Sequence, residues 1–506
     1  MAGYRCSHEG VAVSDRTILV EGGALLATSP DARGVSVFKG IPYAAEPVGP
    51  LRWRAPQPVT PWKGARSAEK YGANSLQSIV FDDIDPMAAG VSEDCLFLNI
   101  WTPAAPGAAE RLPVMFWIHG GGFVVGSGAE PRYDGANLAG KGIVVVTVNH
   151  RLNALGFLAH PELTAEGQGS GAYAMLDLVA ALRWVQQNIG AFGGDPREVT
   201  IAGESAGSFA VSALMASPFA KNLFARAIGE SGAFFASPSK GLDDLATAEA
   251  AGSAFAAKVG AKSLAELRAA PAEAILAAAP GLGYRPIVDG YFLPEAPARV
   301  FARGAQHDVP LLAGWNKDEG FNFDLMQGEN AARPYEDIVR EIFGGRTDKA
   351  LTLYPAEDFK ASARALGGEL MIIHPTWAWI EAQKATGRAD IFRFRFERAP
   401  LTPDGWFGER SSAEAGAFHA GEIPYVFDNL HAFPWLTTAR DDEIATLASS
   451  YWVNFVKSGD PNGAGLPPWP SYRRESLTMF LDAPPTAGPD IDRERQEFLS
   501  SVIARG

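Results

Sequence analysis

The chain has 506 residues, 47% of them hydrophobic, and a formal net charge of −14. A chain of this size can bury a large core, and its acidity argues against nucleic acid or an anionic membrane as a partner, because both would require a basic surface. The 54 glycines and 36 prolines favour a fold with many turns over one built from long helices.

The start of the chain and its cysteines indicate a reducing compartment. Residues 1–15 (MAGYRCSHEGVAVSD) show neither the basic start nor the apolar stretch of a signal peptide, and no apolar stretch reaches the roughly 20 residues that span a bilayer. Because Cys6 lies near the chain end, we expect both Cys6 and Cys95 to be free thiols. We therefore expect a cytoplasmic protein that has no membrane partner.

Short apolar, β-branched runs alternate with helical patterns along the chain. Apolar residues at three- and four-residue spacing predict a helix over residues 176–189, and small and apolar residues predict another over 205–215. The runs predicted as buried strands are residues 114–118, 143–148, 199–202, 309–314 and 391–396. This alternation predicts an α/β fold with a mainly parallel twisted sheet and helices on both of its faces.

No change of composition marks a linker, so we expect one elaborated domain over residues 1–506. The Ala-rich segment 241–280 predicts two or three helices inserted between strands. These helices are either ordinary surface helices or a cap over the active site, since insertions after strand ends gather at the functional edge of such sheets.

A run of three glycines follows the strand predicted at 114–118, in PVMFWIHGGGFVVGSG. Consecutive glycines allow bare N–H groups to point at one oxygen atom, although a plain turn would have the same sequence. The run lacks the Gly-Lys-Ser/Thr of a phosphate loop and the Gly-x-Gly-x-x-Gly of a dinucleotide site. Its place about 85 residues before a serine motif favours an oxyanion loop.

The triplet Gly-Glu-Ser occurs twice, in GESAG at 203–207 and in GESGA at 229–233. Ser205 follows the strand pattern VTIA and precedes a helical pattern, which is the strand–turn–helix setting of a nucleophile elbow. The glycines on both sides of Ser205 avoid clashes across the tight turn. Ser231 lacks the second glycine, so we interpret it as a strand-end serine whose hydroxyl is satisfied, or as a donor that supports the active site.

A serine nucleophile needs a base and an acid, in the chain order serine, acid, histidine. The histidines that follow Ser205 are His307, His374, His419 and His431. His419 is favoured because it lies in a Gly/Ala-rich loop, GAFHAGEIPYVF, from which an imidazole could reach a strand end. Asp318 and Glu319, in LLAGWNKDEG, follow a predicted strand at the edge where such sheets keep catalytic groups. A solvated turn is the alternative, and composition does not choose between the two acids.

These motifs together resemble the type B carboxylesterases of bacteria, in the carboxylesterase/cholinesterase family with the α/β-hydrolase fold. The resemblance runs from about residue 17 to about residue 500. The matching stretches are FKGIPYAAEPVGPLRWRAPQPV (38–59), SEDCLFLNIW (92–101), FWIHGGGF (116–123), VNHRLNALGFL (148–158), ALRWVQQNIGAFGGDPREVTIAGESAG (181–207), LLAGWNKDEG (311–320), FHAGEIPYVF (418–427) and FVKSGDPN (455–462).

The resemblance implies a role for each candidate residue. It makes Ser205 the nucleophile, Glu319 rather than Asp318 the acid, and His419 the base. It implies that Ser231 supports these groups by hydrogen bonding. The backbone N–H groups that it assigns to the oxyanion hole are those of Gly121, Gly122 and Ala206.

The chain departs from the family pattern at two places. Ser75 stands where the family often has a cysteine that pairs with the one at Cys95, so that disulfide cannot form. In GAYAMLDL (171–178), a hydrogen-bonding set of Asn, Gly and Gln is replaced, and we expect altered packing rather than loss of activity. The replacing residues are Ala172, Ala174 and Leu178.

The function that this resemblance implies is hydrolysis of carboxylic esters by a serine carboxylesterase, without a metal or cofactor. We expect a small-molecule ester as substrate and a monomer or weak homo-oligomer. The alternatives are a catalytically inactive, cholinesterase-like binding protein, and the same machinery acting on carbamates, thioesters or aryl amides. Aromatic residues near the motifs are candidate pocket walls, or simply core: Phe123, Phe234, Phe235, Phe321 and Phe323.

Overall fold

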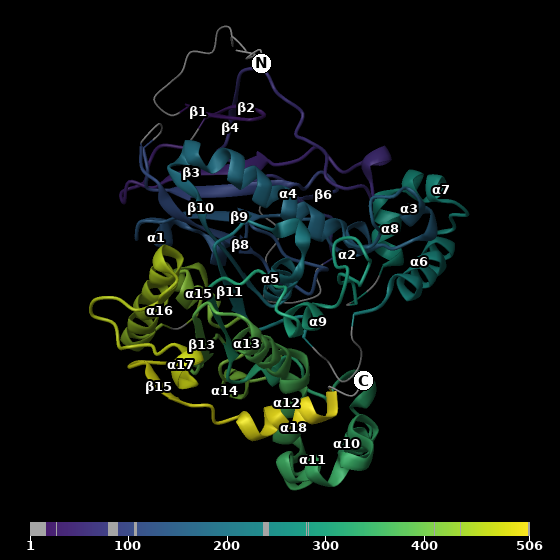
Figure 1. The fold of residues 1–506 in the computed structure, drawn as a ribbon, viewed down its shortest axis with the longest axis vertical. Coiled ribbons are helices and arrows are strands. Elements are labelled where there is room, and N and C mark those ends of the chain that lie inside the picture. The colour runs from purple at the N-terminus through teal and green to yellow at the C-terminus, as the bar shows by residue number, and fades with distance from the viewer. Residues whose placement is uncertain are drawn as a thin grey trace.

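A ten-stranded sheet forms the centre of the molecule (Figure 1). Its strands lie in the order β15–β14–β13–β12–β11–β10–β8–β9–β7–β3. Their bounds are β3 Ser36–Pro42, β7 Phe97–Thr102, β8 Leu112–Ile118, β9 Val144–Val148, β10 Gly194–Glu204, β11 Arg226–Glu230, β12 Leu311–Asn316, β13 Ile391–Phe396, β14 Leu477–Leu481 and β15 Thr486–Pro489. Neighbours from β9 to β14 are parallel, whereas β3–β7, β7–β9 and β14–β15 pair antiparallel. The mainly parallel sheet predicted from the sequence is confirmed.

The computed structural model describes residues 17–26, 28–78, 90–105, 109–235, 242–279, 281, 283–408, 410–435 and 437–503. All five predicted strands lie in the central sheet, with differences at their ends. The strand predicted from residue 309 begins at Leu311 instead, because Pro310 has no N–H group to donate to a neighbouring strand. The carbonyl of Pro310 still accepts a hydrogen bond from the Ala227 N–H, at 3.0 Å.

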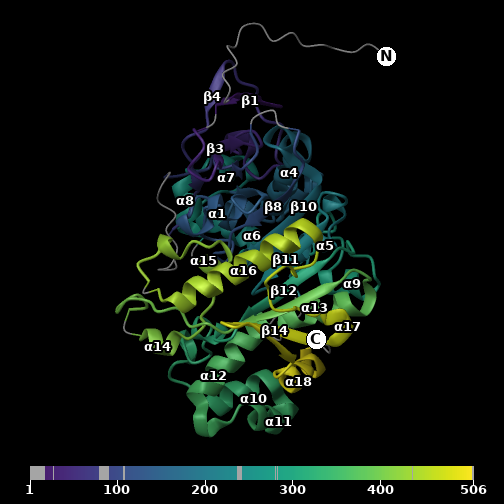
Figure 2. The ribbon, with the colours of Figure 1, turned by 90° about the vertical axis from the view of Figure 1, so that its left-hand side faces the viewer.

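Helices cover both faces of the sheet, because alternate residues of each buried strand point to opposite sides. On one face, Val114, Phe116 and Ile118 of β8 share a core with α4 (Tyr173–Asn188), α5 (Ala206–Ala216) and α13 (His374–Thr386). On the other face, Met115 and Trp117 share a core with α1 (Ala136–Ala139) and α16 (Ala439–Ser458). Figure 2 shows α16 lying across this second face.

Three helices occupy residues 242–279, the described part of the Ala-rich insertion, on the right of Figure 1. They are α6 (Leu245–Val259), α7 (Leu264–Ala269) and α8 (Ala272–Ala278). The side chains of Asp244 and Ser263 accept hydrogen bonds from backbone N–H groups in the first turns of α6 and α7, which explains where these helices begin. All three helices share a hydrophobic cluster with α2 (Asn153–Phe157).

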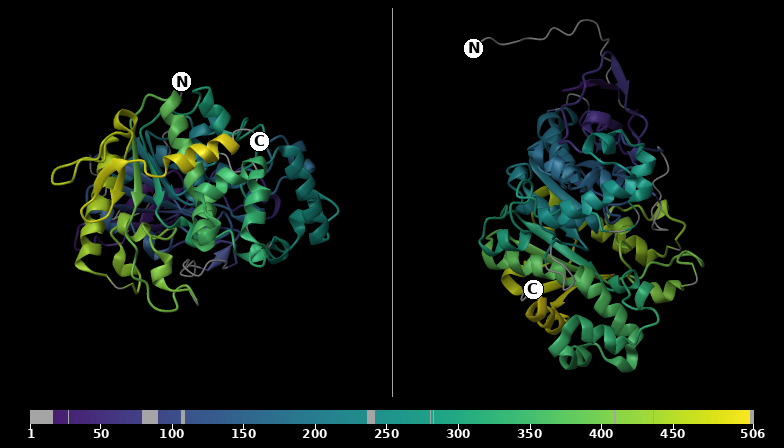
Figure 3. Two further views of the ribbon diagram at one scale, coloured as in Figure 1. Left: turned by 90° about the horizontal axis from the view of Figure 1, so that it is seen from below. Right: turned by 90° about the vertical axis from the view of Figure 1, so that its right-hand side faces the viewer.

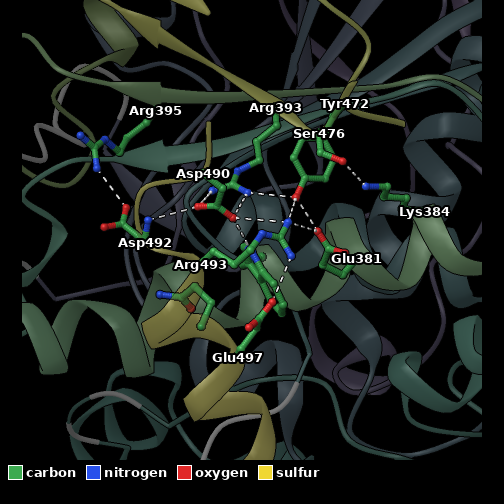
Figure 4. Close-up of polar contacts among 12 residues, drawn as sticks. Glu381, Lys384, Arg393, Arg395, Tyr472, Ser476, Asp490, Asp492, Arg493 and Glu497 are labelled. Carbon is green, nitrogen blue, oxygen red and sulfur yellow. Dashed lines mark hydrogen bonds and ion pairs between the residues drawn. The ribbon is translucent and has the colours of Figure 1, made fainter. Parts of the chain in front are cut away.

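The far end of the molecule has a hydrophobic cluster of its own, formed by α10 (Tyr335–Phe343), α11 (Thr347–Leu353), α12 (Phe359–Gly368) and α18 (Arg493–Ile503). Figure 3 shows the yellow C-terminal helix α18 beside the green helices at this end. Asp490, just before α18, accepts two hydrogen bonds from the Arg393 guanidinium of β13, at 2.6 and 2.7 Å (Figure 4). Both side chains are 2% exposed, so this ion pair anchors the C-terminal segment inside the protein. None of the described helices is both long and apolar enough to cross a bilayer.

Candidate active site

Ser205 lies in a strained turn between β10 and α5. Its φ of 51° and ψ of −121° lie outside the regions that non-glycine residues normally adopt. The turn is tight enough that a Cβ atom on Gly207 would lie 2.0 Å from the Ile118 carbonyl oxygen, and one on Gly203 would lie 2.6 Å from the backbone of Gly207. The two glycines of GESAG are therefore required by packing, as expected for a nucleophile elbow.

The two Gly-Glu-Ser triplets lie side by side in the sheet. β10 and β11 are parallel, and their register pairs Gly203 with Gly229 and Glu204 with Glu230. The Ser205 N–H donates to the Glu230 carbonyl at 2.9 Å, and the Ser231 N–H donates to a carbonyl of β12 at 2.9 Å. The repeated motif therefore places two serines at the ends of adjacent strands.

Glu319 connects the second serine to His419. One carboxylate oxygen of Glu319 accepts the Ser231 hydroxyl at 2.6 Å and the Asn316 N–H at 2.8 Å. The other oxygen lies 2.6 Å from Nδ1 of His419. Glu319 is fully buried, so these hydrogen bonds take the place of water around its charge. The neighbouring Asp318 has a different role. Its carboxylate accepts a hydrogen bond from the backbone N–H of Ala417 at 2.8 Å, which holds the loop that carries the imidazole.

A second carboxylate faces the other nitrogen of the imidazole. Nε2 of His419 lies 3.2 Å from Oε1 of Glu204, the residue that precedes Ser205. Burial alone would lower the pKa of His419, but the carboxylates of Glu204 and Glu319 more than offset this and raise that pKa to about 10. Burial also raises the pKa of Glu204 well above its ordinary value. The charge of each of these two groups therefore depends on the charge of the other.

A third carboxylate lies close behind this pair. Glu422 accepts a hydrogen bond at 2.5 Å from the side-chain amide of Asn316, the residue whose backbone N–H donates to Glu319. Burial raises the pKa of Glu422 to about 7. Asn316 thus links the loop after β12 to the helical turn after His419, and fixes the two acids relative to each other.

The glycine run packs directly against the serine elbow. A Cβ atom on Gly120 would lie 3.2 Å from Cβ of Ser205 and 2.6 Å from a carboxylate oxygen of Glu204. Gly121 and Gly122 have φ values of 103° and 62°, which favour glycine, and a Cβ atom on Gly121 would lie 2.1 Å from the Val125 carbonyl oxygen. The loop therefore needs glycine for its shape. Ala206 is the first residue of α5, where backbone N–H groups lack helical partners.

The five candidate pocket aromatics fall into two groups. Phe323 meets the His419 ring edge to face at 5.0 Å, and Phe123 stacks with Phe234 at 6.1 Å. Phe235 instead packs on Phe301 and Trp379, within the core on the α5 side of the sheet. Phe321 is buried in the core on the α16 side, where it contacts Phe407. Of the five, Phe323 is the ring that contacts the proposed base.

The remaining candidate histidines are placed elsewhere. His307 is 2.8 Å from the Ser217 carbonyl, His374 is 3.0 Å from the Gln496 side chain, and His431 is exposed. Sequence reasoning assigned no role to Glu204 or Glu422. The available signal was a carboxylate in an otherwise apolar strand end, VTIAGE, and another three residues after His419.

The comparisons with known proteins agree with this architecture. A model of the carboxylesterase family matches residues 19–498. The chain belongs to that family. Among the relatives of this carboxylesterase, the fumonisin B1 esterase of Sphingopyxis macrogoltabida is 38% identical over 90% of this chain and 85% of that protein. The para-nitrobenzyl esterase of Bacillus subtilis is 36% identical over 92% of this chain and 95% of that protein.

Solved structures extend the likeness to three dimensions. A PNB esterase structure superposes with a TM-score of 0.83 at 33% identity and covers 96% of this chain and 99% of that chain. The carboxylesterase EST55 of Geobacillus stearothermophilus superposes with a TM-score of 0.81 at 34% identity, covering 96% of this chain and 99% of that chain. The fold is therefore that of the α/β hydrolases, and the protein is a carboxylic ester hydrolase.

The two departures from the family pattern involve buried packing positions in this carboxylesterase. Cys95 is a free, buried thiol, and it lines the same small cavity as Ser75. Burial raises the pKa of Cys95 to about 12, which makes it a poor nucleophile. Cys6 lies outside the described residues. The three replacements in the stretch 171–178 all lie in the core on the α5 side of the sheet: Ala172, Ala174 and Leu178.

Proposed function

We propose that this carboxylesterase hydrolyses its substrate through an acyl-enzyme formed on Ser205. The observation that supports this most directly is the hydrogen-bonded series from Ser231 through Glu319 to His419, whose other ring nitrogen lies 3.2 Å from the carboxylate of Glu204, the residue before Ser205. A hydroxyl on a strained elbow, an imidazole and a buried carboxylate are the three groups that serine hydrolysis requires.

In the first half-reaction, Oγ of Ser205 attacks the ester carbonyl while Nε2 of His419 takes its proton. Glu319 holds the Nδ1–H of the imidazole and stabilises the imidazolium that forms. The N–H groups of Gly121, Gly122 and Ala206 donate to the developing oxyanion. Loss of one such donor typically lowers kcat by about 10²–10³-fold.

The second half-reaction releases the acid. His419 first protonates the departing alkoxide, and the neutral imidazole then takes a proton from water as the water attacks the acyl-enzyme. For these steps the imidazole has to begin neutral, because a protonated imidazole cannot accept another proton. The carboxylate of Glu204, 3.2 Å from Nε2, influences how readily His419 reaches that state.

We infer a neutral ester of a carboxylic acid as the substrate class. Carbamates, thioesters and aryl amides undergo the same attack, and relatives named phenmedipham hydrolase and fatty acyl-CoA hydrolase show that the family includes varied substrates.

The helical insertion acts as a cap over this site in our proposal. Tyr284, which follows α8, packs both on Val124 and Val125 of the glycine loop and on the cluster that contains the three helices.

The test combines a covalent probe with a matched pair of serine variants. A fluorophosphonate should label the wild-type protein on Ser205, and Ser205→Ala should abolish labelling and reduce hydrolysis of p-nitrophenyl acetate to near background while the fold persists. Ser253→Ala, on an exposed helical position, is the control and should behave as wild type. A wild-type protein that neither reacts with the probe nor hydrolyses esters would instead be an inactive binding member of the family.

A further inference from the structure

Two buried histidines stack on each other at the base of the glycine loop. His119 directly follows β8 and His150 lies two residues beyond β9, and the parallel register of these neighbouring strands pairs Ile118 with Val148. The centroids of the two imidazole rings are 4.7 Å apart, with 5° between the ring planes. Both side chains are at most 2% exposed. The proposed catalytic steps use neither ring, although His119 immediately precedes the glycine run.

The ring of His119 fixes one peptide of the glycine loop. Its Nδ1 lies 2.8 Å from the carbonyl oxygen of Gly120. A carbonyl oxygen only accepts hydrogen bonds, so Nδ1 carries a proton and is the donor. Because the peptide bond is planar and trans, the Gly121 N–H of that same peptide points in the direction opposite to the carbonyl. The imidazole therefore sets the direction of an N–H group that we assign to the oxyanion hole.

The other two proposed oxyanion donors are fixed by the backbone. The carbonyl of Gly121 accepts the N–H groups of Val124 and Val125, both at 3.1 Å, so the Gly122 N–H is directed away from them. The N–H of Ala206 is fixed by its place at the start of α5. Gly121 is thus the donor whose direction depends on a side chain.

The glycine loop closes over the edge of the His119 ring. A Cβ atom on Gly126 would lie 2.5 Å from Nδ1 of His119 and 2.5 Å from the Gly120 carbonyl oxygen, so the backbone packs directly on this hydrogen bond. The side-chain amide of Gln77 accepts the Gly126 N–H at 2.8 Å and donates to the Gly126 carbonyl at 3.0 Å. The edge of the ring is therefore enclosed by backbone that Gln77 holds in place.

His150 supports the flat face of the same ring. Its Nδ1 lies 2.9 Å from the Arg151 carbonyl oxygen and is likewise the donor, which fixes the plane of the His150 ring. Its Nε2 is buried and has no hydrogen-bond partner among the described residues, so a protonated ring would bury an unpaired N–H. Burial lowers the pKa of both imidazoles, that of His119 to about 3. The two neutral rings can therefore stack without charge repulsion.

We propose that His150 is a positioning residue for the oxyanion hole, which it serves by holding the His119 ring against the Gly120 carbonyl. This inference rests on the proposed function and adds to it the side chains that align the Gly121 N–H. Without the stack, the His119 ring can turn, which lengthens its hydrogen bond to Gly120 and tilts the peptide. A displacement of about 1 Å can lower a rate by about 10²-fold, so His150 should affect kcat more than substrate binding.

The experiment measures kcat and KM for p-nitrophenyl acetate, together with the inhibition constant of phenyl trifluoromethyl ketone, whose adduct with a serine carries an oxyanion. His150→Ala should lower kcat by about 10–100-fold, raise the inhibition constant by a similar factor and leave KM within about threefold. His150→Phe retains a flat ring and should keep kcat within about fivefold of the wild type.

His307→Ala is the matched control for the loss of a packed histidine. His307 also lies 2.8 Å from a backbone carbonyl oxygen, that of Ser217, and meets the Phe224 ring edge to face. It precedes β12, whereas Glu319 follows that strand, so it lies at the end of the strand remote from the site. This variant should match the wild type in kcat and in the inhibition constant.

A double-variant cycle tests whether His150 acts through His119. His119→Phe keeps a ring for His150 to stack on but has no N–H to donate, so it should lower kcat by about 10²–10³-fold. Adding His150→Ala to His119→Phe should lower kcat by less than about threefold more, because the hydrogen bond to Gly120 is already absent. Losses that multiply in full would contradict the proposed connection.

The outcomes separate this inference from the proposed function. A folded His150→Ala enzyme with wild-type kcat, or one whose inhibition constant is unchanged, would overturn the positioning role and leave ester hydrolysis intact. A His150→Phe enzyme as impaired as His150→Ala would also overturn it. If His150→Ala does not fold, His150→Leu fills the space without a flat ring and should show the same loss, and wild-type kcat in that variant would overturn the inference. Absence of any ester hydrolysis in the wild type would instead overturn the proposed function itself.

Discussion

Replacing Glu204 by glutamine tests the charge balance around the proposed base. The glutamine keeps the shape of the side chain but removes a carboxylate that lies 3.2 Å from Nε2 of His419. At an effective dielectric constant of about 20, a charge pair at that distance interacts by about 5 kcal/mol, equivalent to a pKa change of about four. Burial raises the pKa of Glu204 and so weakens its negative charge, and we therefore expect the pKa of His419 to fall by less than this upper limit.

The assay is the pH dependence of kcat/KM for p-nitrophenyl acetate from about pH 5 to about pH 11, because the acid limb reports the base in the free enzyme. Removal of a negative charge favours the neutral imidazole, so the acid limb of Glu204→Gln should move to lower pH. Glu422→Gln is the matched control, since Glu422 reaches Asn316 instead of the imidazole, and its acid limb should move by less than half as much. An acid limb of Glu204→Gln that stays in place, or moves to higher pH, would refute the electrostatic account.

Three further predictions address the glycine loop, the C-terminal anchor and acid stability. Gly121→Ala should lower kcat by about 10²–10³-fold, because its Cβ atom would lie 2.1 Å from the Val125 carbonyl oxygen and displace an oxyanion donor. Unchanged steady-state kinetics would contradict the proposed donor role. Arg393→Met should lower the free energy of unfolding by about 3–5 kcal/mol in urea titrations, because it removes the cation that donates two hydrogen bonds to the buried Asp490 carboxylate and leaves Trp377 among its remaining donors. Asp490→Asn added to it should restore part of the loss, and strictly additive effects in the double variant would contradict the coupling of the pair. Burial lowers the pKa of His374 to about 4. Below about pH 6.5 the unfolded chain binds a proton before the folded protein does, so the free energy of unfolding falls toward pH 4 by up to about 1.4 kcal/mol per pH unit. His374→Asn should flatten that slope, and an equal slope in the variant would show that the imidazole does not contribute.

Several parts of the site could be predicted because their signals are local. The elbow at Ser205 depends on a strand, a sharp turn and a helix that are contiguous in sequence, and the small residues needed there are visible in GESAG. The glycine loop is similar, since a positive φ at Gly121 and Gly122 is a property of single residues. The run at 391–396, in which phenylalanine alternates with arginine, coincides with β13 because strand preference is also a local property.

Other parts could not be predicted, because they depend on which strand ends become neighbours. Residue types alone did not choose between Asp318 and Glu319, yet the fold directs one to the loop backbone and the other to the imidazole. The same holds for the aromatics: Phe234 and Phe235 are adjacent in sequence, but Phe234 stacks on Phe123 of the glycine loop, whereas Phe235 packs on Trp379 in the core.

The amino-acid sequence by itself determined the α/β pattern, the strained serine turn and the glycine loop, because each follows from the backbone preferences of residues that are close together in the chain. Only the tertiary structure decided which ionisable groups surround His419. Its two carboxylate neighbours come from residues 204 and 319, and their effect depends on burial and on distances of 3.2 and 2.6 Å that no local preference encodes. Electrostatic interactions of this kind depend on spatial separation and on exclusion of water, and both are properties of the folded chain.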